Sequence, residues 1–444
     1  MAEEQQQVLM SVEAEALIEA LEVFPIKNIG SPKWQKQHEY IEKLNMQALL
    51  SASAQEEEFV KETLITLGKV TCLIEDLLSV EIWKQNVFNV IVQTNFKPKT
   101  SIPLYMVLYH EATLANLLET ILFHKESLES AEDATLDLLD YCYRKLSASV
   151  GRKFDFSENL PKDGSAVDTL KELEKQQEKM DFEIAVKVVS ILRYLTDALD
   201  SLPLSMASRM MNTHNIPCLL VELVENPPWT KSENGKTTKY IEGKWEEMKG
   251  PEVLQLTKIE AQVWLSIYNL LMNPECLKKY NFNSFNKAQV VKLKSYMTEV
   301  LLDQLPMLCD MRRYLEQLSM SDPNPPKLDL VLEQLPEIRD RIISSNEGKW
   351  KGIAKYQMKH FFDPSNDEIK QQAQRLADTY NFDVMDSLLT EVPKCCVCGN
   401  EATKRCSRCR VEWYCKRECQ VKHWPKHKQV CDTMSGNVNS QKSS

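Results

Sequence analysis

The sequence predicts an all-α fold with a small metal-binding module near its C-terminal end, and three observations support this. Apolar residues recur at steps of three and four through most of residues 8–390, as at Trp34, Ile41 and Leu44, which is typical of a helix face. Glycine is scarce, at 11 of 444 residues, which suits helices and counts against the phosphate loops of nucleotide-binding α/β enzymes. Eight of the 13 cysteines crowd into residues 395–431.

The predicted helices follow one another and are separated by helix-breaking segments. Apolar stripes predict helices at 70–78, 102–123, 131–147, 166–200, 216–225, 252–272, 286–304, 327–344 and 366–378. Segments rich in Pro, Gly, Asn and Asp lie between them, at 96–103, 151–165, 225–229, 321–326 and 361–367. Residues 230–248 depart from the pattern because they are polar and tolerate β structure. There we expect a loop or a small hairpin that projects from the helical body.

The regular spacing of the helices suggests a repeat architecture. Residues 111–128 align without gaps with residues 260–277: Glu–Ala opens both segments and apolar residues coincide at several core-like steps. The offset between them suits three or four repeats of about 40 to 47 residues, the length of armadillo and HEAT repeats. We therefore predict an armadillo/HEAT-like helical superhelix, with a compact irregular helical domain as the alternative.

This pattern divides the chain into four parts. Residues 1–345 form the predicted helical body, and residues 346–394 a helical connector. The cysteine-rich module spans residues 395–431, and residues 432–444 are expected to be a disordered tail.

Charge is distributed unevenly between the body and the module. The formal net charge is −10, but residues 394–431 hold ten Lys or Arg and three Asp or Glu, which leaves −17 on residues 1–393. Seven zinc-bound thiolates and two zinc ions would bring the module to about +4. An acidic body argues against nucleic acid as the main partner, because phosphate binding depends on Lys and Arg.

Cysteine usage and the chain ends predict an intracellular protein without a membrane span. The first residues carry no basic n-region or cleavage signal, no apolar run reaches 18 residues, and the last residues carry no lipidation motif. We therefore expect a cytoplasmic protein with reduced thiols, in which clustered cysteines bind metal and do not form disulfides.

The motifs of common enzymes are absent from the sequence. It contains no phosphate loop, dinucleotide-binding fingerprint, HExxH helix or GxSxG elbow. The carboxylate runs, such as residues 56–58, have polar neighbours, which is typical of a solvated helix face. We therefore predict that the protein is not an enzyme.

The cysteine-rich module has four ligand pairs at chelating spacings. A C-x2-C turn brings two sulfurs within reach of one metal at about 2.3 Å, and an x3 spacing puts two ligands one helical turn apart. Four pairs make two closed tetrahedral sites, which indicates two structural Zn²⁺ ions and no metal catalysis. The pairs are Cys395 and Cys398, Cys406 and Cys409, Cys415 and Cys419, and His427 and Cys431.

Spacing also identifies two residues that are not ligands. Cys396 would pair with Cys398 only as C-x-C, which abandons the x2 turn. His423 lies eight residues before Cys431 and cannot chelate with it in one turn, whereas His427 can. Because His423 stands one turn beyond Cys419, we expect it to pack beside the first site or to support it.

The complete ligand pattern resembles the MYND zinc finger. The pattern is C-x2-C-x7-C-x2-C-x5-C-x3-C-x7-H-x3-C, with YC at 414–415, CQ at 419–420 and HW at 423–424. In that family the two zinc sites interleave along the chain. The resemblance therefore implies a first zinc on Cys395, Cys398, Cys415 and Cys419 and a second on Cys406, Cys409, His427 and Cys431.

The resemblance also implies a peptide-binding surface. MYND fingers bind short proline-containing peptides on a surface that includes the residues matching Gln420 and Trp424, and Trp413 would border it. The alternative for Trp424 is that it only packs in the finger's small core.

Over nearly its whole length the chain is similar to a family of MYND proteins that preassemble axonemal dynein arms for motile cilia. The segments that carry this similarity are 216–229, 263–275, 329–338 and the finger itself. The resemblance implies an adaptor or assembly factor at centriolar satellites or dynein assembly foci. It also implies four partners: a leucine-rich-repeat dynein assembly factor, an FK506-binding prolyl isomerase, a heat-shock chaperone and axonemal dynein chains.

Two alternatives come from other MYND proteins. A transcriptional corepressor-type regulator would reside in the nucleus, yet the sequence has no long Lys/Arg cluster typical of an import signal. A lysine methyltransferase is disfavoured, because such enzymes carry glycine-rich cofactor loops and further zinc cysteines after the finger. Here only 13 residues follow the finger.

Overall fold

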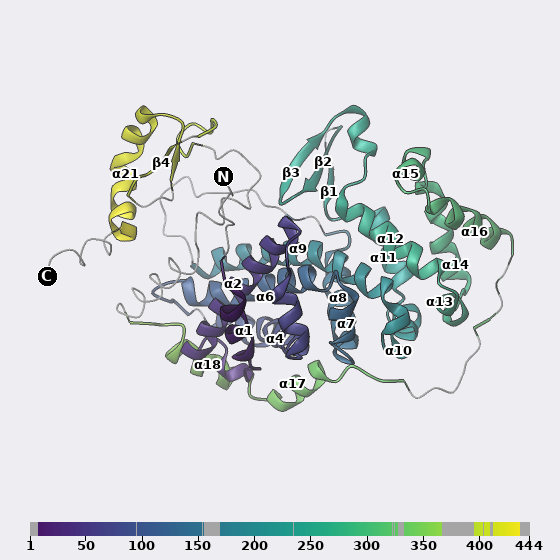
Figure 1. Ribbon diagram of the computed structural model, residues 1–444, viewed down its shortest axis with the longest axis horizontal. Coiled ribbons are helices and arrows are strands. Elements are labelled where there is room, and N and C mark those ends of the chain that lie inside the picture. Colours follow the sequence, from purple (N-terminus) through teal and green to yellow (C-terminus); the bar gives the residue numbers. More distant parts are fainter. Residues whose placement is uncertain are drawn as a thin grey trace. The chain divides into compact units, whose positions relative to one another are not determined.

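The computed structural model describes residues 8–94, 96–152, 154, 169–233, 235–321, 323, 325–326, 333–365, 395–402, 404–408 and 412–435. The chain divides into a large compact unit, Leu9–Ser365, and a smaller unit that contains the finger (Figure 1). The large unit is the helical body, so the all-α prediction is confirmed. The predicted helix at 366–378, most of the connector and residues 436–444 of the tail lie outside the described residues.

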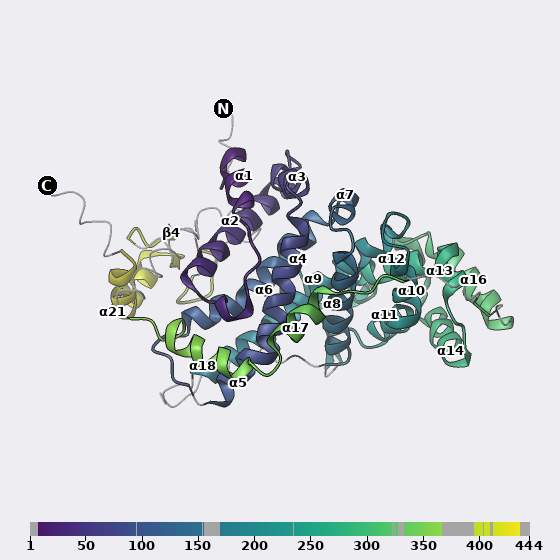
Figure 2. The ribbon, with the colours of Figure 1, turned by 90° about the horizontal axis from the view of Figure 1, so that it is seen from below.

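Nine α-helices make up the first part of the body, within the residues described above. They are α1 (Ser11–Glu19), α2 (Pro32–Ala54), α3 (Phe59–Thr66), α4 (Val70–Trp83), α5 (Asn89–Gln93), α6 (Ile102–Ile121), α7 (Lys125–Glu129), α8 (Ala134–Ser149) and α9 (Thr169–Asp197). The long α9 packs against α6 and α8 on one side and against a later helix, α12 (Lys258–Met272), on the other (Figures 1 and 2). It therefore joins the earlier and later helices of the body.

The later helices of the body are shorter. They are α10 (Ser205–Ser208), α11 (Ile216–Glu225), α12, α13 (Pro274–Lys279), α14 (Ser284–Lys292), α15 (Glu299–Gln304), α16 (Leu308–Met320), α17 (Ile338–Asn346) and α18 (Trp350–His360). Local sequence explains where several of them begin. Thr257 accepts a hydrogen bond from the backbone N–H of Glu260 while the Glu260 carboxylate accepts from the N–H of Thr257, which is a capping box at the start of α12.

Short turns of irregular helix join some of these elements. The 3₁₀ turns are η1 (Ile26–Asn28), η3 (Leu199–Ser201), η5 (Gly250–Leu254) and η6 (Leu293–Tyr296), and the π-helical turns are η2 (Lys84–Phe88) and η4 (Arg209–Thr213). The π turn η2 links α4 directly to α5. Such a turn re-aims the side chains that follow, and Lys84 at its start points into the body's buried charge cluster described below.

The two segments that align as a possible repeat share a local arrangement. Residues 111–128 span the end of α6 and most of α7, and residues 260–277 span α12 and the start of α13, so each is a long helix, a break and a short helix. Both long helices pack against α9. This arrangement is compatible with a repeat, and the superhelix itself stays a prediction.

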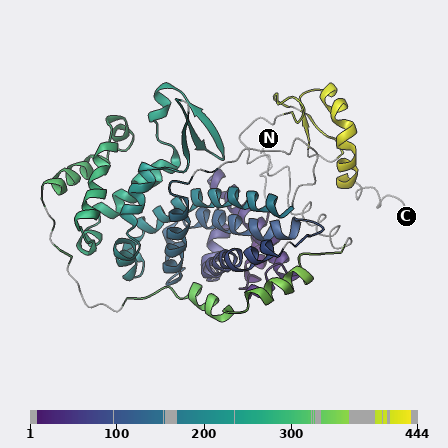
Figure 3. The ribbon, with the colours of Figure 1, turned by 180° about the vertical axis from the view of Figure 1, so that it is seen from behind.

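The polar segment 230–248 forms a three-stranded antiparallel sheet, one strand more than a hairpin (Figure 3). Its strands are β1 (Thr230–Glu233), β2 (Lys236–Ile241) and β3 (Lys244–Met248), in the order β1-β2-β3. Tyr240 and Trp245 are cross-strand partners, and both rings pack against Phe182 of α9 at centroid distances of 4.8 and 5.8 Å. The aromatic side chains therefore fix the sheet to the body.

The last helices of the body return to its first ones (Figure 2). Helix α17 packs on α4 and α8, and α18 packs on α5, η1 and η2. Gly30 has φ +88°, and a Cβ there would lie 2.8 Å from the ring of the buried Phe362, so glycine allows this close approach. The body was predicted to end at residue 345; its compact unit runs on to Ser365 because these contacts hold α18 against it.

Among the described residues, no helix combines the length and the apolar character that crossing a bilayer requires.

Candidate metal centre

The finger is a short hairpin followed by a helix. Strands β4 (Lys404–Arg405) and β5 (Trp413–Tyr414) pair antiparallel, and α21 (Arg417–Ser435) follows them. A small core holds these elements together, and its buried members are Cys395, Ala402, Cys406, Tyr414, Cys419 and Cys431. Most of these are predicted metal ligands, so the finger has few apolar residues with which to stabilise its fold.

The first C-x2-C turn is closed by backbone hydrogen bonds. The N–H of Gly399 donates to the carbonyl of Cys395 at 2.9 Å, and the N–H of Cys395 donates to the carbonyl of Asn400 at 2.7 Å. Gly399 has φ +72°, a left-handed conformation that glycine adopts without steric cost. The turn therefore brings Cys395 and Cys398 to the same side.

The first group of ligand atoms contains Cys395, Cys398, Cys415 and Cys419. The Sγ atom of Cys398 lies 3.4 Å from that of Cys415 and 3.9 Å from that of Cys419, and the last two sulfurs are 3.7 Å apart. A zinc ion with four thiolates at about 2.3 Å sets neighbouring sulfurs about 3.8 Å apart. The spacing of these sulfurs therefore fits a tetrahedral zinc site.

The second group contains Cys406, His427 and Cys431. The Sγ atom of Cys406 lies 3.8 Å from that of Cys431 and 3.3 Å from Nε2 of His427. All three side chains are buried. Cys409, the predicted fourth ligand, lies outside the described residues.

The two groups interleave along the chain, as the MYND resemblance implied. Cys395 and Cys398 of the first turn meet Cys415 and Cys419, while Cys406 meets residues near the end of α21. Each metal would thus connect two segments that are distant in sequence. The first group offers four cysteine sulfurs, and soft thiolate ligands in a tetrahedral set suit zinc.

The structure brings the two predicted non-ligands together. Cys396 Sγ lies 3.5 Å from Nδ1 of His423, and the hydroxyl of Tyr414 lies 3.1 Å from the same nitrogen. Partial burial and the neighbouring Glu412 carboxylate raise the pKa of Cys396 to about 11. Glu412 completes this third group. Sequence spacing gave no signal for Glu412, because its proximity depends on the β4–β5 pairing.

His423 also stacks on the ring of His427, a second-group residue, with centroids 5.5 Å apart. His423 therefore contacts a residue of the second group as well as Cys396, which directly follows the first-group residue Cys395.

The predicted peptide-binding residues lie on α21 and β5. Trp424 and Trp413 are half-buried and pack against the small core, and Gln420 is half-buried one helical turn before Trp424. Val421, next to Gln420, is 63% exposed. Pro425 lacks an N–H, so the carbonyl of Val421 has no helical donor at that position. Trp424 thus packs against the small core while part of its side chain stays exposed.

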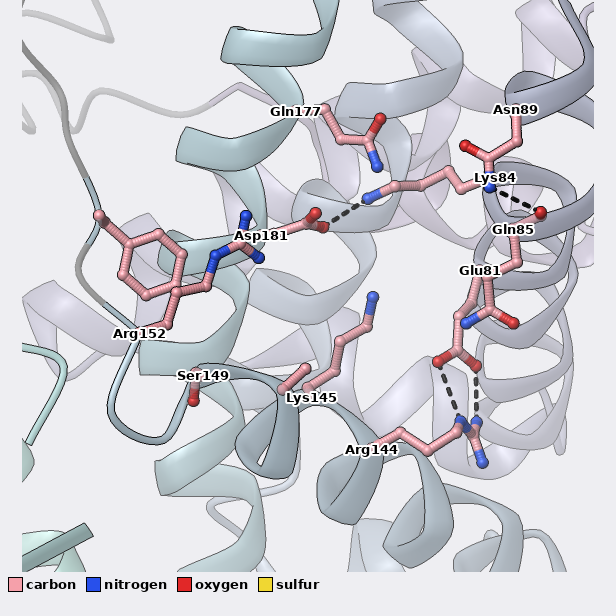
Figure 4. A pocket seen from close by; sticks show the side chains of 12 residues that line it. Glu81, Lys84, Gln85, Asn89, Arg144, Lys145, Ser149, Arg152, Gln177 and Asp181 are labelled. Carbon is pink, nitrogen blue, oxygen red and sulfur yellow. Dashed lines mark hydrogen bonds and ion pairs between the residues drawn. The ribbon is translucent and has the colours of Figure 1, made fainter. Parts of the chain in front are cut away.

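A second candidate site is a small cavity in the body (Figure 4). Its volume is about 190 Å³, and charged residues from α4, η2, α8 and α9 line it. The Lys84 ammonium lies 2.6 Å from the Glu111 carboxylate and 2.7 Å from that of Asp181. Lys145 also contacts Glu111, at 2.5 Å.

The charges of this cavity compensate one another. Arg144 pairs with Glu81 at 2.6 Å, and Arg152 pairs with Glu178 at 2.9 Å. Burial would raise the pKa of Glu111, but Lys145 and Lys84 lower it to about 2. The buried pairs of this cluster connect η2 and α8 to Glu111 of α6, and Lys84 also reaches α9, so we assign the cluster a structural role and no chemistry.

Comparisons with known proteins agree with the geometry of the finger. Residues 395–431 match the model of the MYND finger family. Over 36 residues, 8% of each chain, the sequence is 53% identical to the human histone-lysine N-methyltransferase SMYD3. Over 41 residues, 9% of this chain and 10% of the other, it is 42% identical to the rat N-lysine methyltransferase SMYD2. The similarity to these two methyltransferases thus covers at most 9% of this chain.

A longer similarity covers both the body and the finger. The chain is 33% identical over 437 residues to the zinc finger MYND domain-containing protein 10 homolog of Drosophila melanogaster, which covers 93% of this chain and 96% of that protein. No solved structure matches the chain. The chain therefore belongs to the family of zinc finger MYND domain-containing protein 10.

Proposed function

We propose that the protein is an adaptor for the preassembly of inner and outer axonemal dynein arms with chaperones, and thus for motile cilia. In this role the finger captures a peptide from one partner while the helical body holds others. Membership of the family supports this proposal, because the similarity extends over both parts of the chain. The proposed site of action is the cytoplasm, at dynein assembly foci or centriolar satellites.

The observation that carries the proposal is the closed pair of ligand groups. We assign the first zinc to Cys395, Cys398, Cys415 and Cys419, and the second to Cys406, Cys409, His427 and Cys431. Bound zinc supplies structural cross-links in such closed sites and leaves no open position for a substrate. Through these ligands the zinc ions would connect α21 to the β4–β5 hairpin. One face of the helix would then be available to a partner.

Gln420 and Trp424 of α21, together with Trp413 of β5, form the proposed peptide site. The indole of Trp424 packs against the core and is only partly buried, which suits stacking against a proline ring of a peptide. The proposed partners are a leucine-rich-repeat dynein assembly factor, an FK506-binding prolyl isomerase, a heat-shock chaperone and axonemal dynein chains.

The replacement of Trp424 tests the peptide site. Trp424→Ala in the full chain should abolish co-precipitation of the leucine-rich-repeat factor from ciliating cells, while metal analysis still finds two zinc ions per chain. Lys422→Ala is the matched control, because Lys422 is exposed on another face of α21 and should leave binding unchanged. Unchanged binding by Trp424→Ala would refute the peptide site.

The cellular role needs a separate test. Proximity labelling in ciliating cells should recover dynein chains and chaperones with the intact protein, and deletion of residues 395–444 should lose one class of these partners. Nuclear staining with recovery of chromatin proteins would instead favour a corepressor-type regulator.

A further inference from the structure

Residues of the three-stranded sheet, of α9 and of the start of α12 line a groove. Figures 1 and 3 show the sheet projecting from the helices in this part of the body. The volume of the groove is about 700 Å³, within the range of ligand-binding clefts. Apolar side chains from α9, the sheet and the start of α12 line it: Val186, Ile241, Met248, Leu256 and Ile259. None of these residues belongs to the finger.

The charged residues of the groove are mainly acidic. Its four carboxylates belong to Glu119, Glu183, Glu242 and Glu252, against two lysines, Lys187 and Lys258. Lys187 already pairs with Glu119 at 2.8 Å. The groove therefore has an excess of negative charge within a chain segment that carries −17 overall, and this favours a cationic partner.

Glu242 occupies a strained position at one end of the groove. It has φ +45° and precedes Gly243 at φ +88°, and the two residues form the tight turn between Ile241 and Lys244. Such turns favour Asn or Gly at the first position, because a longer side chain is strained in the left-handed conformation. The turn thus holds an exposed carboxylate at the groove despite a conformational cost.

Glu183 contributes a partly desolvated carboxylate on the α9 side of the groove, and Lys179 lies 3.9 Å from it along the same helix. Burial raises the pKa of its carboxyl group, and burial together with Glu183 raises the pKa of Tyr240 to about 12. A cation brought beside Glu183 would stabilise its ionised form. The same groove therefore offers an apolar floor and two carboxylates that gain from a positive ligand.

We propose that this groove docks a short segment of a partner protein in which apolar side chains alternate with Lys or Arg. The apolar side chains would contact Val186, Met248 and Ile259, and the cations would meet Glu183 and Glu242. The edge strand β3 carries Lys244, Glu246 and Glu247, and charged edges disfavour the addition of a further strand. Side-chain contacts, and not strand pairing, would therefore hold the segment.

The test measures binding of a fluorescein-labelled peptide, KLKVKLKVK, to the full chain by fluorescence anisotropy at physiological salt. Glu242→Lys should raise the dissociation constant about fivefold, because the change removes one favourable charge contact and adds a repulsive one. Glu233→Lys is the matched control: it is the same substitution at an exposed position of β1, outside the groove, and it should bind like the wild type.

Two further measurements separate groove binding from general attraction to an acidic chain. The peptide KSKSKSKSK keeps the charge but lacks the apolar side chains, and it should bind at least tenfold more weakly, because it buries no apolar side chain in the groove. Trp424→Ala should bind KLKVKLKVK like the wild type, which keeps this result independent of the finger. Equal effects of Glu242→Lys and Glu233→Lys, or equal binding of both peptides, would overturn the proposal.

Discussion

The identity of each metal ligand depends on where single sulfur atoms lie within the finger. Cys395 and Cys396 are adjacent in sequence, yet only Cys395 joins the first group. Cys396 lies beside His423 and Glu412, in a group that mixes a thiol, an imidazole and a carboxylate. Four thiolates make a better zinc site than this mixture, because each contributes a full negative charge and a strong bond to zinc.

Replacement of individual residues should therefore change zinc content selectively. Cys396→Ser and His423→Ala should each retain two zinc ions per chain, whereas Cys398→Ser should lose at least one, since it removes a sulfur within 3.4 Å of Cys415. Metal analysis of the purified full-length variants measures this directly. Loss of zinc from Cys396→Ser would show that the third group holds a metal.

For single residues, the sequence predicted the spacing of the metal ligands but not which distant residues would lie beside them. The x2 and x3 spacings are local geometry, so they identify Cys395 with Cys398 and Cys415 with Cys419 without a structure. That these two pairs share one metal depends on how the chain returns after β5. The contact between His423 and Tyr414 likewise arises only when α21 folds back over the hairpin.

Among the elements of the body, α18 has the most specific attachment. Gln357 is fully buried, and its amide donates to the carbonyls of Ile26 at 2.8 Å and Ile29 at 3.1 Å. Its own carbonyl accepts from the indole N–H of Trp83 at 2.8 Å. The Gln357 side chain thus forms hydrogen bonds with both η1 and α4. Without it, these buried polar groups would need water as a partner.

Gln357→Leu should destabilise the body by about 3 kcal/mol, because it leaves a buried indole N–H and backbone carbonyls without partners. Urea unfolding followed by tryptophan fluorescence measures the change. Lys355→Leu, at an exposed position of the same helix, should shift the free energy of unfolding by no more than about 0.5 kcal/mol. Equal unfolding midpoints for the two variants would contradict the anchoring role of Gln357.

The sequence predicted the existence of most elements because helical periodicity is local. It could not predict that α18 packs on η1, since Gln357 and Ile26 are 331 positions apart and nothing near either residue marks the other. The sheet was missed in part for a similar reason. Tyr240 and Trp245 become a pair only through the turn at Glu242 and Gly243, and Glu-Gly is a weaker turn signal than Asn-Gly.

At the scale of the whole molecule, the body buries polar side chains that form hydrogen bonds with one another between helices. One such group joins α2, α4 and α6: His38 Nδ1 lies 2.8 Å from His110 Nδ1, and His110 Nε2 lies 3.1 Å from Asp76. Glu42 lies 4.0 Å from Nε2 of His38, and the Trp34 ring stacks on the His38 ring at 5.7 Å. Two ring nitrogens share a hydrogen bond only when one donates its proton and the other accepts it. His38 and His110 therefore cannot both be fully protonated.

The stability of the body should therefore fall in mild acid. Burial and the neighbouring His110 lower the pKa of His38 well below its usual value, so below about pH 6.5 the unfolded chain binds a proton that the folded chain does not. Stability from this group is complete above pH 6.5 and is lost at about 1.4 kcal/mol per pH unit as the pH falls, until the folded-state pKa is reached.

Urea unfolding between pH 7.5 and 5.5 should show this slope in the wild type and a reduced slope in His38→Gln. His360→Gln, at an exposed histidine of α18, should keep the wild-type slope. If His38→Gln and the wild type lose stability equally with acid, another buried group senses the pH.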